Sequence, residues 1–185
     1  MPLIFYDLET TGLNPYHSRI IEIGAVKYEN GNVSTFSEIV NPEVKLSHFT
    51  IDYTGITNEM VQDKDTIDIV IKRFIKFCGN DSPYLVAHNN DGFDKLFLEN
   101  IRNFKDYSKN VKYIDTLKLS RRLLPNKKGH KLVNLCNYFN IKYGRGHRAL
   151  HDSELLDKVY RCLLDIANIT HPYEIEKFIY NNPIL

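Results

Sequence analysis

The sequence predicts an α/β fold, in which a mixed five-stranded sheet is flanked by helices. Two alternating segments rich in β-branched residues, Ile20–Tyr28 and Val33–Val40, flank an Asn30-Gly31-Asn32 turn and should form an antiparallel hairpin. Two short apolar segments later in the chain are separated from earlier strands by helical patterns, which is typical of parallel strands joined by crossovers. This order of elements suits a layered α/β domain.

The elements of the first half follow from local patterns. A short apolar run over Leu3–Leu8 predicts the first strand, ahead of the hairpin. After the hairpin, Thr57 can cap a short helix over Asn58–Gln62, with an acidic residue in its first turn. From Thr66 to Cys78 apolar residues recur at helical spacing, and Gly79 is expected to end that helix.

The second half alternates in the same way. Its predicted elements are strands over Pro83–Ala87 and Val111–Ile114, and helices over Asp91–Phe104, from the last strand to Leu124, and over Leu132–Phe139, Ala149–Ile166 and Tyr173–Tyr180. No internal repeat, linker or low-complexity tract interrupts this pattern. Residues 1–185 are therefore expected to form one domain with a single sizeable core.

The charge balance limits how the chain can bind a partner. Lys and Arg number 24 and Asp and Glu number 23, which gives a formal net charge of +1. Proteins that grip long duplex DNA usually carry a strong basic excess. If nucleic acid is the substrate, contact is therefore expected to be local, at an end or over a short single strand.

The cysteines and apolar segments bear on the compartment. Cys78, Cys136 and Cys162 lie far apart, which argues against a zinc site or a disulfide framework and favours buried free thiols. No apolar run approaches the roughly 18–20 residues of a membrane span, and the N-terminus lacks signal-peptide character. We expect a soluble, intracellular protein without a membrane partner, cytoplasmic or nuclear. Its many Asn, Ile, Lys and Tyr residues suggest an AT-rich genome, such as a viral one.

The first candidate site is an acidic pair at the end of the first strand. Asp7 and Glu9 are two residues apart, so their side chains share one face of that strand. Two neighbouring carboxylates repel each other unless cations neutralise them, and Mg²⁺ or Mn²⁺ prefers such oxygen ligands. The alternative is a pair of solvated acids. In the following turn, exposed backbone N–H groups could hold a hydroxyl or phosphate, and Leu13 could either contact a base or pack on the core.

The second candidate segment, His88–Asp94, directly follows a predicted strand. Asp94 would lie in the first turn of the next helix, either facing a cleft or serving only the helix dipole. Asp91 is the expected N-cap of that helix. His88 and Asn89 are expected to be structural or to position a substrate rather than to be catalytic.

The third candidate segment is His147–Asp152. On one helix these two ends would point roughly 140° apart, so they can meet at one centre only if His147 precedes the helix and Asp152 lies on its second turn. His147 could then act as a general base near neutral pH. His151 is a rival base that is expected to face elsewhere. Five basic residues could steer phosphates or form a solvated rim: Lys127, Lys128, Lys131, Arg145 and Arg148.

Four carboxylates and a histidine on three separated elements predict one mechanism. Two metal ions about 3.5–4 Å apart would activate a water and stabilise the leaving 3′ oxygen during in-line attack on a phosphodiester.

The motifs resemble those of the DEDDh, or DnaQ-like, exonucleases of the ribonuclease H-like fold. The matching segments are Asp7–Pro15, Arg19–Val26, Thr54–Thr57, His88–Asp94, Asp115–Leu117 and His147–Asp152. They run in family order over about residues 3–165, which leaves 166–185 as a C-terminal helical extension. The spacing of the second motif is one residue longer than is usual in proofreading members and resembles the TREX-type branch.

The resemblance also implies roles for single residues. Asp7, Glu9 and Asp152 would bind the tighter of two Mg²⁺ ions, for which Mn²⁺ could substitute, and Asp94 would support the second. His147 matches the general base, and Arg148 stands where a tyrosine-using sister group would have Tyr. The Thr10 backbone would hold the terminal hydroxyl, while Leu13 and Ile56 pack on the terminal nucleotide. The expected substrate-binding residues are Thr10, Thr11, Leu13, Ile56 and Asn89.

The expected function is a stand-alone 3′→5′ exonuclease that releases nucleoside monophosphates from single-stranded or frayed DNA. One alternative is an exoribonuclease that trims RNA 3′ ends. Another is a proofreading subunit that acts with a separate polymerase, in which the C-terminal helix with Ile175 could dock on the partner or pack on the core. A catalytically dead nucleic-acid binder is disfavoured because all five chemical positions are intact. Self-association is left open.

Overall fold

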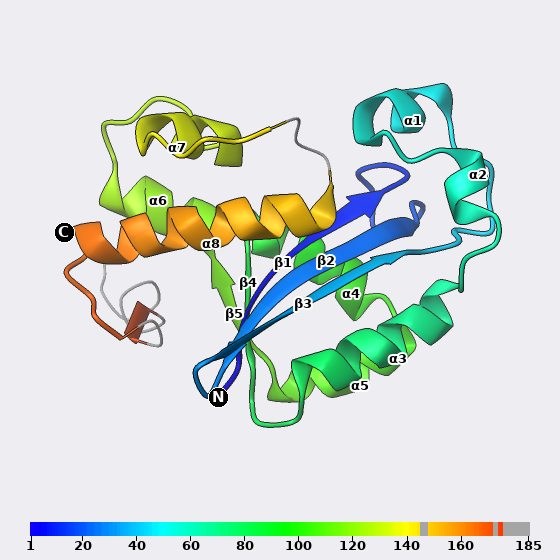
Figure 1. Cartoon of the computed structure of the whole chain (residues 1–185), viewed down its shortest axis with the longest axis horizontal. Helices are drawn as coiled ribbons and strands as arrows, with labels where there is room; N and C mark the ends of the chain where they lie inside the picture. The colour runs from blue at the N-terminus through cyan, green and yellow to red at the C-terminus, as the bar shows by residue number, and fades with distance from the viewer. Residues whose placement is uncertain (145–147, 172–173, 176–185) are drawn as a thin grey trace.

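The computed structural model describes residues 1–144, 148–171 and 174–175, and a five-stranded sheet runs through its centre (Figure 1). The strands are β1 (Leu3–Thr10), β2 (Ile20–Glu29), β3 (Asn32–Ile39), β4 (Tyr84–Ala87) and β5 (Lys112–Asp115). Their order in the sheet is β3-β2-β1-β4-β5. β1 and β2 pair antiparallel, as do β2 and β3, whereas β4 pairs parallel with both β1 and β5. This confirms the predicted mixed sheet with its hairpin.

Helices cover both faces of the sheet (Figure 1). They are α1 (His48–Thr54), α2 (Asn58–Val61), α3 (Ile67–Cys78), α4 (Asp94–Glu99), α5 (Arg102–Tyr107), α6 (Thr116–Leu123), α7 (Leu132–Tyr138) and α8 (Ala149–Ile166). Two short 3₁₀ turns, η1 (Asn90–Gly92) and η2 (Ser108–Asn110), complete the described elements. Within the described ranges, no helix has both the length and the apolar character that crossing a membrane requires.

The strand period divides the core between the two faces. Ile4, Tyr6 and Leu8 of β1 lie on one face, in a core cluster with residues of α3, α4 and α5. Leu3 and Phe5 point to the opposite face, where they join α6, α7 and α8. β1 therefore lies at the middle of the molecule, so side chains at its C-terminal end are held by both layers.

The helix predicted over Asp91–Phe104 is wrong as a single element. It is divided into η1, α4 and α5, with Ile101 in an extended conformation between the last two. The side chain of Asn100 donates to the Pro15 carbonyl oxygen at 3.0 Å, and Phe104 is fully buried against the core. The change of chain direction at Ile101 lets Phe104 reach the core. This contact is non-local, so helical periodicity alone does not reveal it.

One further helix, α1, was not predicted, and two other predictions have different outcomes. The helix expected over Tyr173–Tyr180 lies almost wholly outside the described residues, of which Ile175 is buried in the core. All three cysteines are free, as predicted, although Cys162 is only partly buried.

Candidate active site

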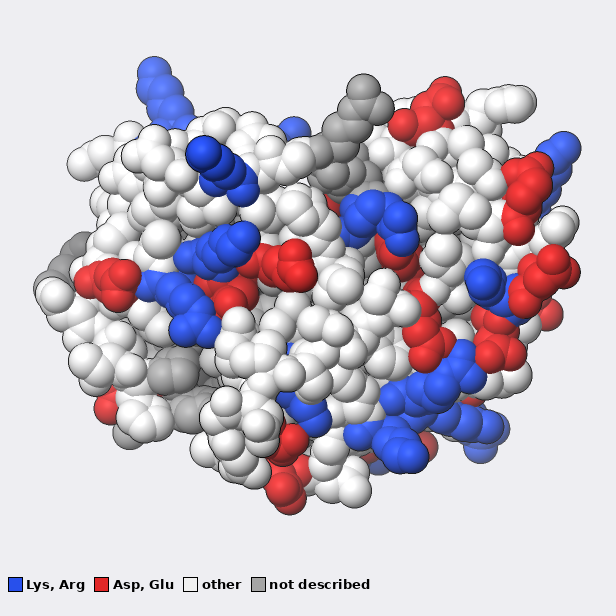
Figure 2. Space-filling view, in the orientation of Figure 1, with Lys and Arg blue, Asp and Glu red and all other residues white. Residues whose placement is uncertain are grey.

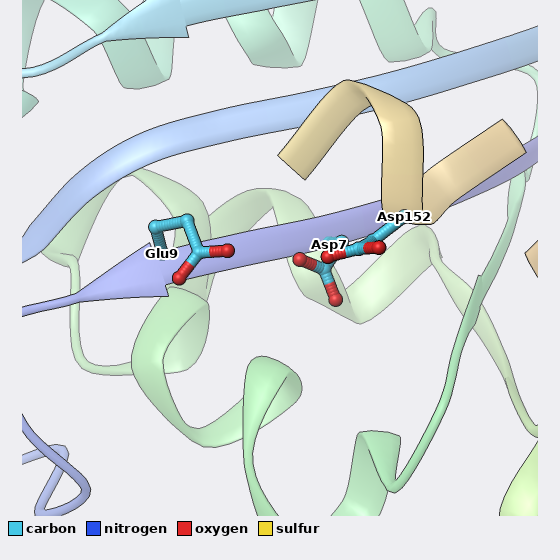
Figure 3. A group of neighbouring side chains, drawn as sticks. All are labelled: Asp7, Glu9 and Asp152. Atoms are coloured by element: carbon cyan, nitrogen blue, oxygen red, sulfur yellow. The ribbon is translucent and has the colours of Figure 1, made fainter. Parts of the chain in front are cut away.

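Three carboxylates meet at the C-terminal end of β1. Asp7 and Glu9 lie on one face of β1, as their spacing predicted, and Asp152 reaches them from the first turn of α8, not from the second turn as predicted (Figure 3). One carboxylate oxygen from each residue lies within 4.8 Å of those of the other two. Glu9 is 7% exposed, and Asp7 and Asp152 are partly exposed to the cavity above them. This spacing suits a shared cation.

Asp94 is the fourth acid, and it lies in the first turn of a helix as predicted, although α4 begins at Asp94 itself. Its side chain is 2% exposed and accepts from the backbone N–H groups of Asp94 itself and Leu8. Its Oδ1 atom is buried without a hydrogen-bond partner among the described residues. Leaving a buried acceptor unsatisfied costs about 1–3 kcal/mol, more when it is charged. A cation or a water molecule that it holds would satisfy this atom.

The acids raise one another's pKa values. Burial first, and then the charges of Asp94, Glu9 and Asp152, raises the pKa of Asp7 well above its usual range. Burial followed by Asp152 and Glu22 raises the pKa of Glu9 to about 8, and burial raises the pKa of Asp94 to about 8. Without a positive charge, the cluster therefore resists full ionisation at neutral pH. A divalent cation reverses this preference because it attracts the ionised form of each group.

The start of α8 is fixed to β2 by the buried glutamate Glu22, which lies in a matching motif but had no predicted role. Glu22 is fully buried, and Arg148 donates to it from Nε at 3.1 Å and from Nη2 at 2.8 Å. The backbone N–H of Ala149 also donates to Glu22, at 3.0 Å. Arg148, considered above for phosphate steering, is thus engaged as an anchor. A single acid within the apolar run Ile20–Val26 was the available signal, because a buried charge requires a partner.

Gly24 allows the close approach of α8 to β2. A Cβ atom at this position would lie 2.0 Å from the Leu150 nitrogen, which no side chain could accommodate. The Ser153 hydroxyl donates to the Gly24 carbonyl oxygen at 2.9 Å. Since Gly24 pairs with Asp7 across the sheet, this contact sets the distance between Asp152 and the acids of β1.

The segment after β4 is held by groups from the neighbouring elements. His88 Nδ1 lies 2.9 Å from Thr116 Oγ1, and its Nε2 lies 2.7 Å from the His130 carbonyl oxygen. Nε2 must donate to that carbonyl, and burial lowers the pKa of His88. Both ring nitrogens of this cavity-lining residue are therefore engaged by neighbouring protein groups. Asp115, at the end of β5, accepts from the backbone N–H groups of Asn89 at 3.1 Å and Asp91 at 3.2 Å. Asp115 was present in a matching motif, but no role had been assigned to it.

Asp91 is not the N-cap of α4, contrary to the prediction. The helix begins at Asp94 after Phe93, whose side chain makes no capping hydrogen bond, and Asp91 forms an ion pair with Lys118 of α6. Its place in the 3₁₀ turn η1 directs it away from the first turn of α4. His147 lies outside the described residues, and the rival base His151 is absent from the described residues that line the cavity.

A cavity of about 440 Å³ opens above the acids. Thr10, Thr11, Leu13 and Asn89 line it, as expected for substrate-binding residues, and Leu13 is 84% exposed rather than packed on the core. Ile56 does not line it, because its side chain is fully buried with Ile21, Leu46 and Val61.

Two aromatic side chains of α1, Phe49 and Tyr53, line the cavity and were not identified from the sequence. Among the described residues that line it, none is Lys or Arg. On the face drawn in Figure 2, basic and acidic side chains are interspersed, in agreement with the net charge of +1. The described part of this cavity thus combines an acidic floor with an apolar side.

Comparisons with known proteins agree with this geometry. The family model RNase_T, described as Exonuclease, matches residues 4–160. The DNA polymerase III PolC-type of Oceanobacillus iheyensis is 42% identical over 185 residues, covering 97% of this chain and 13% of that protein. The Bacillus subtilis protein of the same name is 41% identical over 156 residues, covering 82% and 10%. The chain therefore spans about a tenth of the length of the curated relatives it matches.

Solved structures show the same fold. Exonuclease X in complex with 5′ overhanging duplex DNA is 28% identical with a TM-score of 0.72, covering 91% of this chain and 94% of that one. Exonuclease I of E. coli in complex with a dT13 oligonucleotide is 18% identical with a TM-score of 0.76, covering 96% and 43%. The second likeness, at this identity, concerns the fold alone. The ribonuclease H-like architecture predicted from the motifs is thereby confirmed.

Proposed function

Because this chain belongs to the exonuclease family RNase_T, we propose that it is a two-metal-ion 3′→5′ exonuclease that releases nucleoside monophosphates from single-stranded or frayed DNA. The observation that carries the proposal is the carboxylate cluster of Asp7, Glu9 and Asp152, with oxygens within 4.8 Å of one another. Asp94 lies beside it with a buried, unpartnered oxygen. Acids held this closely suit phosphodiester hydrolysis assisted by divalent cations.

The donor set fits hard divalent cations, with Mg²⁺ the first choice and Mn²⁺ able to substitute. Asp7, Glu9 and Asp152 would hold one ion, and Asp94 with Asp7 would hold the second. When bound, the ions supply Lewis acidity and neutralise charge that develops on the phosphate. The raised pKa values of Glu9 and Asp94 support this assignment, because at neutral pH such groups ionise fully only beside a positive charge.

The remaining residues receive positioning and proton-transfer roles. His147, which directly precedes the Arg148 anchor, is proposed as the general base. The Thr10 backbone would hold the 3′ hydroxyl, and Leu13 and Asn89 would contact the terminal nucleotide. Thr11 Oγ1 accepts from the Arg19 backbone at 2.9 Å, so its part is to shape this turn. Ile56 would support the cavity-lining residues without touching the nucleotide, since its side chain is fully buried.

A specific observation favours a second candidate, a proofreading activity that accompanies a polymerase. The PolC-type relatives are DNA polymerases, and this chain matches only about a tenth of their length. The likeness to Exonuclease X, of whose chain this one covers 94%, supports the exonuclease reaction in either setting. If the purified chain degrades oligonucleotides at ordinary enzyme rates without a partner, the proofreading-subunit alternative is contradicted.

The decisive experiment follows 5′-labelled oligonucleotides with Mg²⁺ and with chelator. We expect a ladder of products shortened from the 3′ end, and nucleoside monophosphates, from single-stranded DNA and from duplexes with a mismatched end. Matched RNA strands test the exoribonuclease alternative, and a preference for RNA of more than about tenfold would overturn the DNA assignment. Release from the 5′ end, or cleavage unaffected by chelator, would overturn the mechanism.

A further inference from the structure

The aromatic side of the cavity is built by α1, a seven-residue helix with a cap at each end. The Ser47 side chain accepts from the Thr50 backbone N–H at 3.1 Å, and Gly55, at φ 71°, donates to the Ile51 carbonyl oxygen at 2.8 Å. These contacts stabilise a helix that is otherwise too short to be stable by itself. α1 is therefore a defined element rather than a loose loop.

α1 has a buried polar side and an exposed aromatic side. Thr50 and Thr54 are 3% and 5% exposed, whereas Phe49 and Tyr53 are 76% and 54% exposed. The Thr50 hydroxyl donates to the Thr11 carbonyl oxygen at 3.3 Å, which ties the helix to the turn that follows the acids of β1. Burial, followed by the charges of Glu9 and Asp152, also raises the pKa of Tyr53, so this side chain lies within the field of the acids.

The two exposed rings are stacked on each other. Phe49 and Tyr53 are four residues apart, which makes them neighbours on a helix surface. Their ring centroids are 5.9 Å apart, with 11° between the ring planes. Both line the cavity that contains Asp7, Glu9 and Asp152. The molecule thus presents two nearly parallel aromatic rings to solvent within the cavity where the reaction is proposed to occur.

We propose that Phe49 and Tyr53 form a stacking platform for the bases of an unpaired DNA strand whose 3′ end lies at the acidic cluster. This inference rests on the proposed function and names how its substrate is recognised. The described residues lining the cavity include four carboxylates and no Lys or Arg, so ionic contacts from those side chains cannot hold the strand. Stacking on aromatic rings supplies binding without charge and tolerates every base.

The platform also explains a preference for unpaired ends. In a duplex, each base is already stacked and paired, so its faces are not available to protein side chains without unstacking. A single strand or a frayed end offers these faces at lower cost. Recognition by stacking would therefore select strand state rather than sequence.

The test combines aromatic substitutions with removal of single bases from the substrate. Phe49→Ala and Tyr53→Ala are each assayed on single-stranded oligonucleotides, intact or abasic at one of the last two positions. We expect each substitution to lower kcat/KM on the intact strand by on the order of tenfold, the size expected for one lost stacking contact. Removing the base that stacks on the platform should lower kcat/KM of the wild type by a similar factor. The same abasic strand should lower kcat/KM of the two alanine variants much less. Phe49→Tyr should retain the wild-type behaviour, and Phe49→Leu, which keeps apolar volume without a ring, should not.

A matched control and a binding assay keep the outcomes distinct. Tyr138, on α7, is 52% exposed and is not among the residues that line the cavity, so Tyr138→Ala should change none of these rates. Fluorescence anisotropy of a labelled strand, measured in an Asp7→Asn background, reports binding without cleavage. If the wild type fails to cleave but Phe49→Ala still weakens strand binding in that background, the platform survives and the proposed reaction does not. If the loss in kcat/KM from removing the aromatic side chain and the loss from removing the base are independent of each other, the platform is overturned. Variants that bind and cleave normally but lose a protein partner would also overturn it.

Discussion

The cavity has two sides that differ in composition, burial and support. We call Asp7, Glu9, Asp94 and Asp152 the acidic floor, and Leu13, Phe49 and Tyr53 the apolar wall. Glu9 and Asp94 of the floor are 7% and 2% exposed, whereas Leu13 and Phe49 of the wall are 84% and 76% exposed. The floor stands on β1, α4 and α8, which meet in the core, while the wall stands on a turn and a seven-residue helix.

The difference separates two tasks. A reaction site needs oxygen atoms fixed to within a fraction of an ångström, which only rigid, mutually packed elements provide. Strand binding needs adaptable apolar faces and tolerates more movement. Substitutions in the floor should therefore act on catalysis and metal binding, and substitutions in the wall on substrate affinity and choice.

The strongest test of the floor is Asp7→Asn. We expect cleavage to fall by at least about 10³-fold, because this carboxylate would serve both cations. In chelator the variant should be at least as thermally stable as the wild type, since its neighbours lose a repelling charge. Oligonucleotide cleavage and thermal unfolding check both expectations. Asp106→Asn, at an exposed acid of α5, should be neutral in each assay. Appreciable residual cleavage in Asp7→Asn would contradict the two-metal assignment.

The anchor between β2 and α8 provides the next largest effect. Glu22→Gln keeps the shape of the side chain but removes the charge that holds Arg148 and reduces its support of Ala149. We expect metal affinity or cleavage to fall by about 10- to 100-fold, as when a group that orients a metal ligand is lost. The free energy of unfolding should fall by about 1–3 kcal/mol. Calorimetric Mn²⁺ titration and denaturant unfolding measure the two effects.

A matched ion pair on the surface serves as the control for that substitution. Arg73 also contacts both oxygens of its partner, Glu38, and its side chain is about as exposed as that of Arg148, at 42% against 49%. The two glutamates differ, because the side chain of Glu38 is 26% exposed and that of Glu22 is 1% exposed. Glu38→Gln should cost no more than about 1 kcal/mol and leave Mn²⁺ affinity unchanged. Equal losses of Mn²⁺ affinity and stability in Glu22→Gln and Glu38→Gln would contradict a specific role of Glu22 in placing the acids of the floor.

The pH dependence of stability is a further way to distinguish the floor from the wall. The pKa of Glu9 is raised from 4.5 to about 8 and that of Asp94 from 3.8 to about 8. A carboxyl whose pKa is higher in the folded chain stabilises the fold at low pH and loses that contribution as pH rises through the folded value. The metal-free protein should therefore become less stable from about pH 4.5 to about pH 8.

Thermal unfolding across that range, in chelator and in Mn²⁺, checks the expectation. Mn²⁺ should raise the midpoint more at pH 8 than at pH 6, by on the order of a few degrees, because the acids ionise when the cation binds. Asp7→Asn should weaken this dependence, whereas Phe49→Ala should not. An unfolding temperature that rises with pH in chelator over this range would contradict the expected loss of stability.

The smallest expected effect concerns the tip of the wall. Leu13→Ala should leave stability within about 0.5 kcal/mol, because the side chain is almost fully exposed. Cleavage of mismatched duplex ends should fall by a few-fold relative to single strands if Leu13 helps to hold the terminal base away from its partner. Val44→Ala, at a half-exposed position outside the cavity-lining residues, is the control. An equal loss on both kinds of substrate would assign Leu13 to general binding instead.

Local patterns were enough to predict much of the fold and most of the floor. Strand alternation placed Asp7 and Glu9 on one face, and the chain order of motifs placed Asp94 in the first turn of a helix and Asp152 near the start of α8, one turn earlier than predicted. The same logic missed the division of the Asp91–Phe104 segment, because the break depends on where Phe104 packs.

The sequence by itself determined which chemical groups are present and which of them share a face, because these depend on residue identity and on the short periods of helix and strand. Only the tertiary structure decided that Glu22 anchors Arg148, that Gly24 admits α8, and that Phe49 and Tyr53 face the acids. Each of these depends on contacts between segments distant in the chain. Their energies arise from packing and burial, which no local pattern encodes.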